Sequence, residues 1–447
     1  MGDHLFLRLN SLVGVAAIVG IAWLMSVDRS SIKWRPVLWG LGLQFGLGVL
    51  VLNPAVSSVF HGAVDAGVNQ LLAFAAKGGE FVFRSTQEHQ VAGPDGTLST
   101  PQGISPPLVN VVTTVLPTII FFSALTALLY QLGLMQVVVR GISVVMVRTM
   151  GTSGAESLSA AGNVFLGQTE APMLVRPFLE KMTKSELNAI MTGGFATVAG
   201  GVLGAYVAFL RDVPHVAGHL VMASLMAAPG ALALAKVVYP ETEEPETAGD
   251  LGEMPAPTSS SVVEAIAVGA GEGVRLAINV AGMLIAMVAI VYMVDWMFGV
   301  VPVRFCEDGA TFGYACTEGV DGRPLGLSDV LGTLFWPLAV LMGVGLDQAG
   351  TVAVLLGEKL ALTEFIAFEH LGKIAADEPG RLSERTVTMA SFALCGFANF
   401  ASIGIQLGGI GGMVPERLSE LSGLGVRAML TGALVSCMSA AMVGVLT

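Results

Sequence analysis

The chain has 447 residues, of which 53% are apolar and only 13% are charged, and its formal net charge is −12. A typical soluble domain carries roughly 25% charged residues, so this chain has too few charges to cover the surface of a soluble protein. The negative net charge also disfavours nucleic-acid binding, which needs a basic surface. We therefore expect an all-α polytopic membrane protein that lies in a lipid bilayer and has no nucleic-acid partner.

The N-terminal part contains two apolar stretches, residues 5–27 and 37–52, which approach the roughly 20 residues of a membrane span. Three basic residues, Arg29, Lys33 and Arg35, lie between them. The positive-inside rule places this short loop in the cytoplasm, so the N-terminus is expected outside. With about eight spans in all, the C-terminus is expected outside as well. Charged positions scattered through 57–84 predict an interfacial helix. Residues 1–107 are thus expected to form part of a scaffold.

Residues 108–240 are expected to form a first repeat, with spans at 108–132, 186–210 and 216–237 and an interfacial helix at 135–150. Between them, segment 151–182 is apolar but contains Glu156 and Glu170. An acidic residue that faces lipid at mid-depth costs roughly 2.5–3.5 kcal/mol, so the segment is expected to fold back as a re-entrant hairpin inside the protein. An acidic stretch, 241–260, reads as a cytoplasmic linker.

Residues 261–447 are expected to form a second repeat, with a hairpin at 349–374 that again contains a Thr-Glu pair, Thr363 and Glu364. A span with a polar, Gly-rich middle follows at 385–412. Paired interrupted segments in two halves are typical of secondary transporters built from inverted repeats. Whether Cys306 and Cys316, in the loop between two spans of this half, form a disulfide is left open by their spacing.

The strongest chemical signal is the run AGNVFLGQTEAP at 161–172. Gly and Pro break helices and expose backbone carbonyls, and carbonyl, Asn and Thr oxygens are hard ligands that suit a small alkali cation. Gln168, Thr169 and Glu170 offer donors and acceptors together, which suits a neutral polar solute such as a sugar or a base. The alternative is a polar turn that serves folding only, but an intramembrane Glu favours function.

A second polar cluster lies at 397–402, which reads FANFAS with several Gly around it. Asn399 and Ser402 are three residues apart and therefore share one face of a helix. Phe397 is suited either to stacking on a planar ring or to ordinary packing.

Three stretches of the chain closely resemble the concentrative nucleoside transporter family: GNVFLGQTEAPMLVRP at 162–177, TEFIA at 363–367 and CGFANFASIGIQ at 395–406. The resemblance extends from about residue 4 to the C-terminus. It implies a homotrimer of protomers with eight spans, two re-entrant hairpins and interfacial helices. It also implies nucleoside uptake coupled to an inward sodium gradient, or to protons in some members, by a transport domain that carries the site across the bilayer.

The resemblance also assigns roles to residues. Gln168, Thr169 and Glu170 would contact the nucleobase, Val202 and Phe397 would line its pocket, and Glu364, Asn399 and Ser402 would hold the ribose hydroxyls. Sodium, the expected coupling ion, would be bound by Asn163, Leu166, Thr197 and Val198 through side chains and carbonyls. No organic cofactor is implied. Thr197 stands in the Gly-rich run 193–202, whose composition suits a helix break.

Asn163 and the Thr197 hydroxyl favour sodium over protons as the driving ion. Gly167 stands where family members that prefer pyrimidines tend to have Ser, so uptake of both purine and pyrimidine nucleosides is expected. The alternatives are a proton-coupled nucleoside symporter, a carrier for another neutral polar solute, and a channel. An intramembrane enzyme is disfavoured, because the chain has no metal-binding His spacing and no nucleophile elbow. A chain of eight spans without an additional N-terminal set suggests a bacterial inner membrane.

Overall fold

The computed structural model describes residues 2–52, 54–83, 91–92, 98–99, 111–249, 259–299, 304–305, 323–324 and 326–447. In the first half, the helices are α1 (Gly2–Leu24), η1 (Arg29–Ser31), α2 (Trp34–Leu52), α3 (Pro54–Phe83), α4 (Val111–Gln131), α5 (Leu134–Met150), α6 (Gly154–Gly162), η2 (Ala171–Phe178), α7 (Lys184–Ala196), α8 (Gly200–Phe209) and α9 (Val216–Val238). Two short strands, β1 (Val91–Ala92) and β2 (Leu98–Ser99), pair antiparallel.

In the second half, the helices are α10 (Val262–Gly299), α11 (Leu327–Leu341), α12 (Leu346–Ala361), α13 (Glu364–Asp377), α14 (Glu384–Leu394), α15 (Phe400–Met413), η3 (Pro415–Arg417) and α16 (Leu418–Leu446). The strands β3 (Arg304–Phe305) and β4 (Arg323–Pro324) pair antiparallel. Cys306 and Cys316 lie outside the described residues, so their pairing stays open. The expected all-helical architecture is confirmed, because helices make up nearly all of the regular structure.

Four helical segments of the described chain are long and apolar enough to cross a membrane: 5–24, 184–209, 216–238 and 415–446. The helices α4 and α5 pass the same test only together, and they meet at a bend of 79°. This bend turns the amphipathic α5 away from the direction of α4, as expected for a helix that lies along an interface. The expected total of eight spans is not established by helix length alone and stays a prediction.

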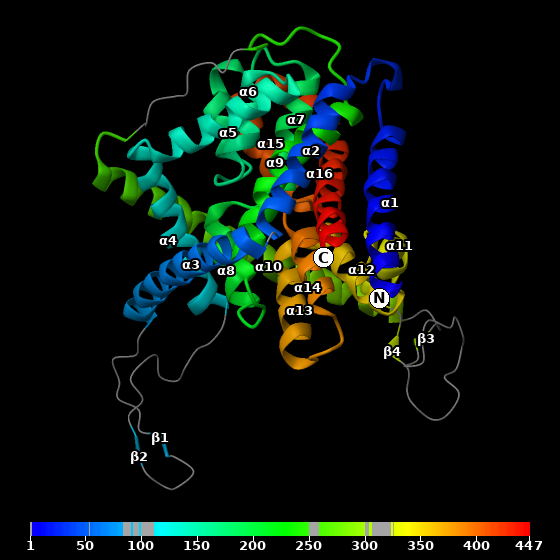
Figure 1. Ribbon diagram of the computed structural model, residues 1–447. Helices are drawn as coiled ribbons and strands as arrows, with labels where there is room; N and C mark the ends of the chain where they lie inside the picture. The colour runs from blue at the N-terminus through cyan, green and yellow to red at the C-terminus, as the bar shows by residue number, and fades with distance from the viewer. Residues whose placement is uncertain are drawn as a thin grey trace.

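Both halves contain the same succession of elements. A short helical hairpin is followed by a capped helix, a break and a second helix: α6, η2, α7 and α8 in the first half, and α12, α13, α14 and α15 in the second. The first hairpin lies at the upper end of the molecule and the second at the lower end (Figure 1). This arrangement has the form expected of an inverted repeat.

The expected span at 186–210 is two helices, because the chain is extended at Thr197 and Ala199, between α7 and α8. The corresponding break between α14 and α15 contains Gly396, whose φ of +119° is a conformation that other residues rarely adopt. A Cβ at Gly396 would lie 2.7 Å from the carbonyl oxygen of Phe195 and 2.8 Å from that of Ala196. The two breaks therefore touch at the centre of the molecule.

The two chain ends lie on the same side of the molecule. In α1, the Arg8 guanidinium donates a hydrogen bond of 2.8 Å to the carbonyl of Thr447. The helices α1 and α16 run next to each other in Figure 1. This placement agrees with an even number of crossings between the termini.

Candidate functional site

The first hairpin holds its polar residues in a turn between α6 and η2. The turn is fixed on one side by the Gly200 amide of α8, which donates to the Phe165 carbonyl at 2.9 Å. Before α6, a capping box forms between Ser153 and Glu156, which explains why the helix begins at Gly154. The turn is therefore anchored to the start of the second half of a broken helix.

Asn163 ends α6 and is fully buried, and neither its amide oxygen nor its amide nitrogen has a hydrogen-bond partner. Its side chain lies against Gly193 of α7, where a Cβ would come 3.2 Å from Nδ2. The Thr197 hydroxyl is one turn away and donates to the Gly193 carbonyl at 2.8 Å. An unsatisfied buried amide is costly, so this position is suited to a bound ligand.

Backbone carbonyls in the first hairpin and at the α7–α8 break are further candidate ligands. Among the hydrogen bonds between described residues, none is accepted by the carbonyls of Asn163, Leu166, Thr197 or Val198. The Asn163 amide oxygen and these free carbonyls form a set of neutral hard oxygen donors of the kind that binds an alkali cation. The four residues predicted to hold sodium lie in the first hairpin and at the α7–α8 break, which the Gly200–Phe165 hydrogen bond joins. Their joint binding of an ion stays a prediction.

The second hairpin presents Glu364, which is 2% exposed and lies in the first turn of α13. Its two carboxylate oxygens accept from different elements: Oε1 from the Tyr206 hydroxyl of α8 at 2.9 Å, and Oε2 from the Asn399 amide at 2.8 Å. The Asn399 Oδ1 in turn accepts from the Ser402 amide and caps α15. Glu364, Asn399 and Ser402 are therefore together, as expected.

The helix α15 joins the two hairpins. Asn399, Ser402 and Gln406 are spaced at three and seven residues and share one face. At one end of this face Asn399 contacts Glu364, and at the other the Gln406 Nε2 donates to the Gln168 Oε1 at 3.1 Å. Seven residues of helix span about 10 Å. The Glu364 carboxylate and the Gln168 amide, which contact the two ends of this face, are therefore held apart by a comparable distance. A solute with two different polar ends fits this spacing.

Gly409 continues this face and lies against Thr169, whose methyl a Cβ at Gly409 would meet at 2.5 Å. Glu170 is next in the chain, and its Oε2 is buried without a partner. Val202 of α8 is buried, and Phe397 is half-buried in the α14–α15 break. The predicted base-contacting residues thus lie in the first hairpin, on α8 and in the α14–α15 break, with Gln168 and Thr169 in contact with α15.

Three residues of this region were not predicted to act: Tyr206, Gln406 and Lys359. Tyr206 stacks on Phe368 with ring centroids 4.5 Å apart and is fully buried. Gln406 belongs to the conspicuous motif at 395–406, so its spacing from Asn399 was the available signal. Tyr206 lies in an apolar stretch that offers no such signal.

The paired hairpins, the two touching helix breaks and the central polar face define a membrane transporter. Family models agree: that for the Na+ dependent nucleoside transporter C-terminus matches residues 219–444 and that for its N-terminus matches 13–86. A third, described as nucleoside recognition (Gate), matches 112–212.

An uncharacterized transporter of Haemophilus influenzae is 39% identical, over 98% of this chain and 97% of its own. Human sodium/nucleoside cotransporter 1 is 37% identical over 98% of this chain, which spans only 64% of the human protein. A solved structure of CNTnw in an inward-facing substrate-bound state superposes with a TM-score of 0.83 at 37% identity, covering 98% of this chain and 99% of that one. An outward-facing double variant of CNTnw gives 0.84 at 37% identity, covering 99% of both.

The chain belongs to the family of Na+ dependent, concentrative nucleoside transporters. Its relatives are multi-pass membrane transporters rather than enzymes.

Proposed function

We propose that the chain imports purine and pyrimidine nucleosides, driven by an inward sodium gradient. The observation that carries this proposal is the polar face of α15, which links Glu364 to Gln168. A carboxylate that accepts from two vicinal hydroxyls forms strong charge-assisted hydrogen bonds, so Glu364, Asn399 and Ser402 suit the ribose. Gln168, Thr169 and Glu170 then face the base, which Val202 and Phe397 flank.

Sodium is proposed to bind Asn163, Leu166, Thr197 and Val198 and to act as the coupling ion. The ion would order the turn after α6, and five residues later the same turn presents Gln168. Sodium and nucleoside would therefore bind with positive cooperativity, and linkage requires that each tightens the other equally.

Transport is proposed to follow an elevator-like alternating access, in which the hairpins and broken helices move as a transport domain against a scaffold. The proposed division is 1–107 for part of the scaffold, 108–240 and 261–447 for the repeats, and 241–260 for a cytoplasmic linker. In the described part of that linker, the Thr247 carbonyl accepts from the Gly154 amide at 2.9 Å, which ties it to the first hairpin. A homotrimer in a bacterial inner membrane, with both termini outside, is proposed from the resemblance.

Uptake of radiolabelled uridine and adenosine into proteoliposomes tests the proposal, with an inward sodium gradient compared with potassium, and each with or without a proton gradient. We expect saturable uptake of both nucleosides that requires sodium. Uptake driven by protons alone would replace sodium as the coupling ion, and an absence of saturable nucleoside uptake by folded protein would refute the assignment of the solute.

A further inference from the structure

Lys359 is a buried cation in the second half of the molecule. It lies in the last turn of α12 and is 2% exposed. Its ammonium donates hydrogen bonds to two backbone carbonyls, that of Ala393 at 2.9 Å and that of Cys395 at 3.3 Å. Among the ion pairs between described residues, none includes Lys359. A buried charge held by carbonyls instead of a carboxylate is unusual and calls for a reason.

The two carbonyls belong to the end of α14, where the helix breaks before α15. A break of this kind frees carbonyls from the helical hydrogen-bond ladder, and the Cys395 carbonyl accepts from the Ser436 hydroxyl as well as from Lys359. In the first half, the carbonyls of Thr197 and Val198 accept no hydrogen bond from a described residue at the corresponding break, and Asn163 of the first hairpin lies against Gly193, four residues before Thr197. In the second half, the hairpin supplies an ammonium at this place. In the second half the cation at the break is therefore the protein's own Lys359 ammonium. In the first half the proposed cation is a sodium ion taken from solution.

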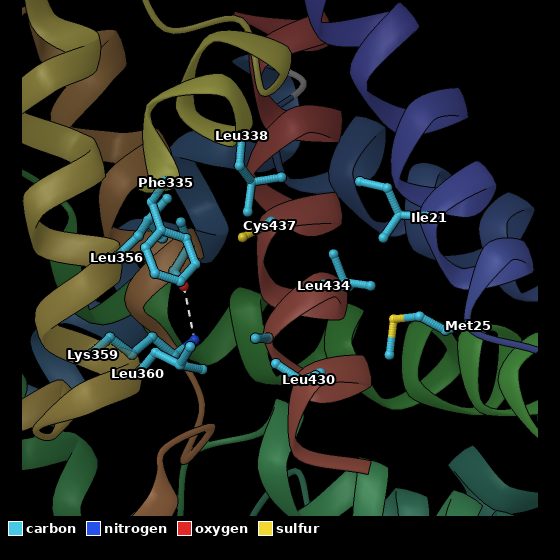
Figure 2. A pocket seen from close by; sticks show the side chains of 12 residues that line it. Ile21, Met25, Phe335, Leu338, Leu356, Lys359, Leu360, Leu430, Leu434 and Cys437 are labelled. Atoms are coloured by element: carbon cyan, nitrogen blue, oxygen red, sulfur yellow. Dashed lines mark hydrogen bonds between the residues drawn. The ribbon is translucent and has the colours of Figure 1, made fainter. Parts of the chain in front are cut away.

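Among the side chains that line the cavity beside Lys359, none other is acidic or basic (Figure 2). The ammonium borders a cavity of about 240 Å³ whose other lining side chains are apolar or thiol, among them Phe335, Leu356 and Cys437. The Glu364 carboxylate lies five residues further along the same hairpin, and its charge attracts the Lys359 ammonium. The cation is thus placed to balance the carboxylate proposed to bind ribose.

The two hairpins then carry matched charges. Each presents one buried carboxylate at its Thr-Glu pair, Glu170 in the first and Glu364 in the second. An uncompensated buried charge is costly, and Glu364 has the ammonium of Lys359 five residues before it on its own hairpin. Lys359 supplies a permanent cation to the second hairpin, whereas the cation proposed for the first hairpin is a bound sodium ion.

We propose that Lys359 is a tethered cation in the position of a second coupling ion, and that the carbonyls of Ala393 and Cys395 form an alkali-cation site once the ammonium is removed. This inference rests on the proposed sodium site at Asn163. It follows that the native chain binds one sodium ion with each nucleoside, and that a chain without the Lys359 ammonium binds two.

The test measures equilibrium binding of radiolabelled uridine to purified protein across a range of sodium concentrations, at constant ionic strength kept with choline. By linkage, the slope of log Kd against log sodium counts the sodium ions bound with uridine. For the native chain we expect a slope of magnitude about one. For Lys359→Ala we expect about two, with weaker binding at low sodium. Lys359→Asn, which supplies an amide oxygen and fills more of the space, should behave in the same way.

Two controls separate charge from packing. Lys359→Arg keeps the cation, has the adjoining cavity to accommodate its larger head group, and should keep the slope near one. Lys236→Met removes another buried lysine, which pairs with Glu156 of the first turn of α6 at 2.8 Å, and should also leave the slope unchanged. Gel filtration and thermal melting establish that each variant is folded.

A slope near one in folded Lys359→Ala and Lys359→Asn would overturn the proposal. So would a complete loss of uridine binding at every sodium concentration in both folded variants, because a mobile ion should replace the tethered one. Failure of the proposed function is recognised separately: a native chain that binds uridine without sodium, or whose sodium dependence survives Asn163→Ala, would refute the sodium site itself.

Discussion

At the scale of single residues, Glu364 is the most connected group of the proposed solute site. It accepts hydrogen bonds from Tyr206 and Asn399, so a neutral Gln would lose the charge that strengthens contacts to hydroxyl groups. Hydrogen bonds to charged groups contribute roughly 1.5–3 kcal/mol, so Glu364→Gln should raise the KM for uridine by about 10- to 150-fold. Concentration-dependent uptake measures this change.

The matched control for Glu364→Gln is Glu358→Gln, on the same hairpin. Glu358 is also buried, but it contacts His370 at 3.0 Å and no residue of the site. Its replacement should leave the KM within about twofold. An equal effect of the two substitutions would mean that Glu364 acts on folding of the hairpin and does not bind the solute.

The ribose assignment also predicts a preference among substrates. A nucleoside that lacks one vicinal hydroxyl leaves a buried acceptor unpaired, which costs roughly 1–3 kcal/mol. Competition by 2′-deoxyuridine and 3′-deoxyuridine against labelled uridine should therefore be about 5- to 150-fold weaker than by uridine itself. Equal competition by uridine and the two deoxynucleosides would contradict the proposed contacts between the ribose hydroxyls and Glu364.

Gly167 controls the space around Glu170. A Cβ at this position would overlap the Glu170 carboxylate, so Gly167→Ser must displace that side chain. We expect the substitution to reduce adenosine uptake more than uridine uptake, because the larger base needs more room beside Gln168 and Glu170. The ratio of the two kcat/KM values is the measurement, and an unchanged ratio would show that Glu170 does not face the base.

At the scale of elements, the α14–α15 break packs closely against the end of α7. Gly396→Ala places a methyl against the carbonyls of Phe195 and Ala196 at a φ of +119°, so both sterics and backbone conformation oppose it. We expect loss of uptake and a lower melting temperature in detergent. Gly404→Ala is the control, because a Cβ there has no heavy atom within 4 Å. Similar melting temperatures for the two variants would contradict the proposed close contact.

The helices and hairpins also differ from Tyr206 in how far they can be predicted from the sequence. The helical content, the two hairpins and the positions of Glu364 and Asn399 follow from polar residues and Gly in otherwise apolar segments, since such residues are expensive in a membrane. Tyr206 could not be found in this way, because a Tyr in an apolar helix is compatible with ordinary packing. Its contact with Glu364 depends on how α8 crosses α13, which is a property of the tertiary structure.

Lys359 illustrates a further limit. Its sequence position, near a hairpin's Thr-Glu pair, does not reveal whether the ammonium reaches water, a carboxylate or a carbonyl. The answer comes from the break after α14, which is 34 residues away from Lys359 at Ala393. Long side chains that span such separations can be assigned only once the packing of the elements is known.

At the scale of the whole molecule, the central claim is that sodium bound at Asn163 prepares the site for the nucleoside. Asn163 and the base-contacting residues share one turn, so a change at the ion site should alter the response to sodium before it alters contacts to the solute. Asn163 contacts neither hairpin carboxylate in the described structure, and Asn163→Ala removes only the buried amide.

The measurement that tests this claim most directly is sodium-gradient-driven uridine uptake into proteoliposomes by the native chain and by folded Asn163→Ala. We expect uptake by the native chain to require sodium. At low sodium, the uptake rate of the variant should be at least about tenfold lower than that of the native chain, and it should partly recover as the sodium concentration rises. Identical sodium dependence in the two proteins would contradict the account, because the ion would then bind elsewhere.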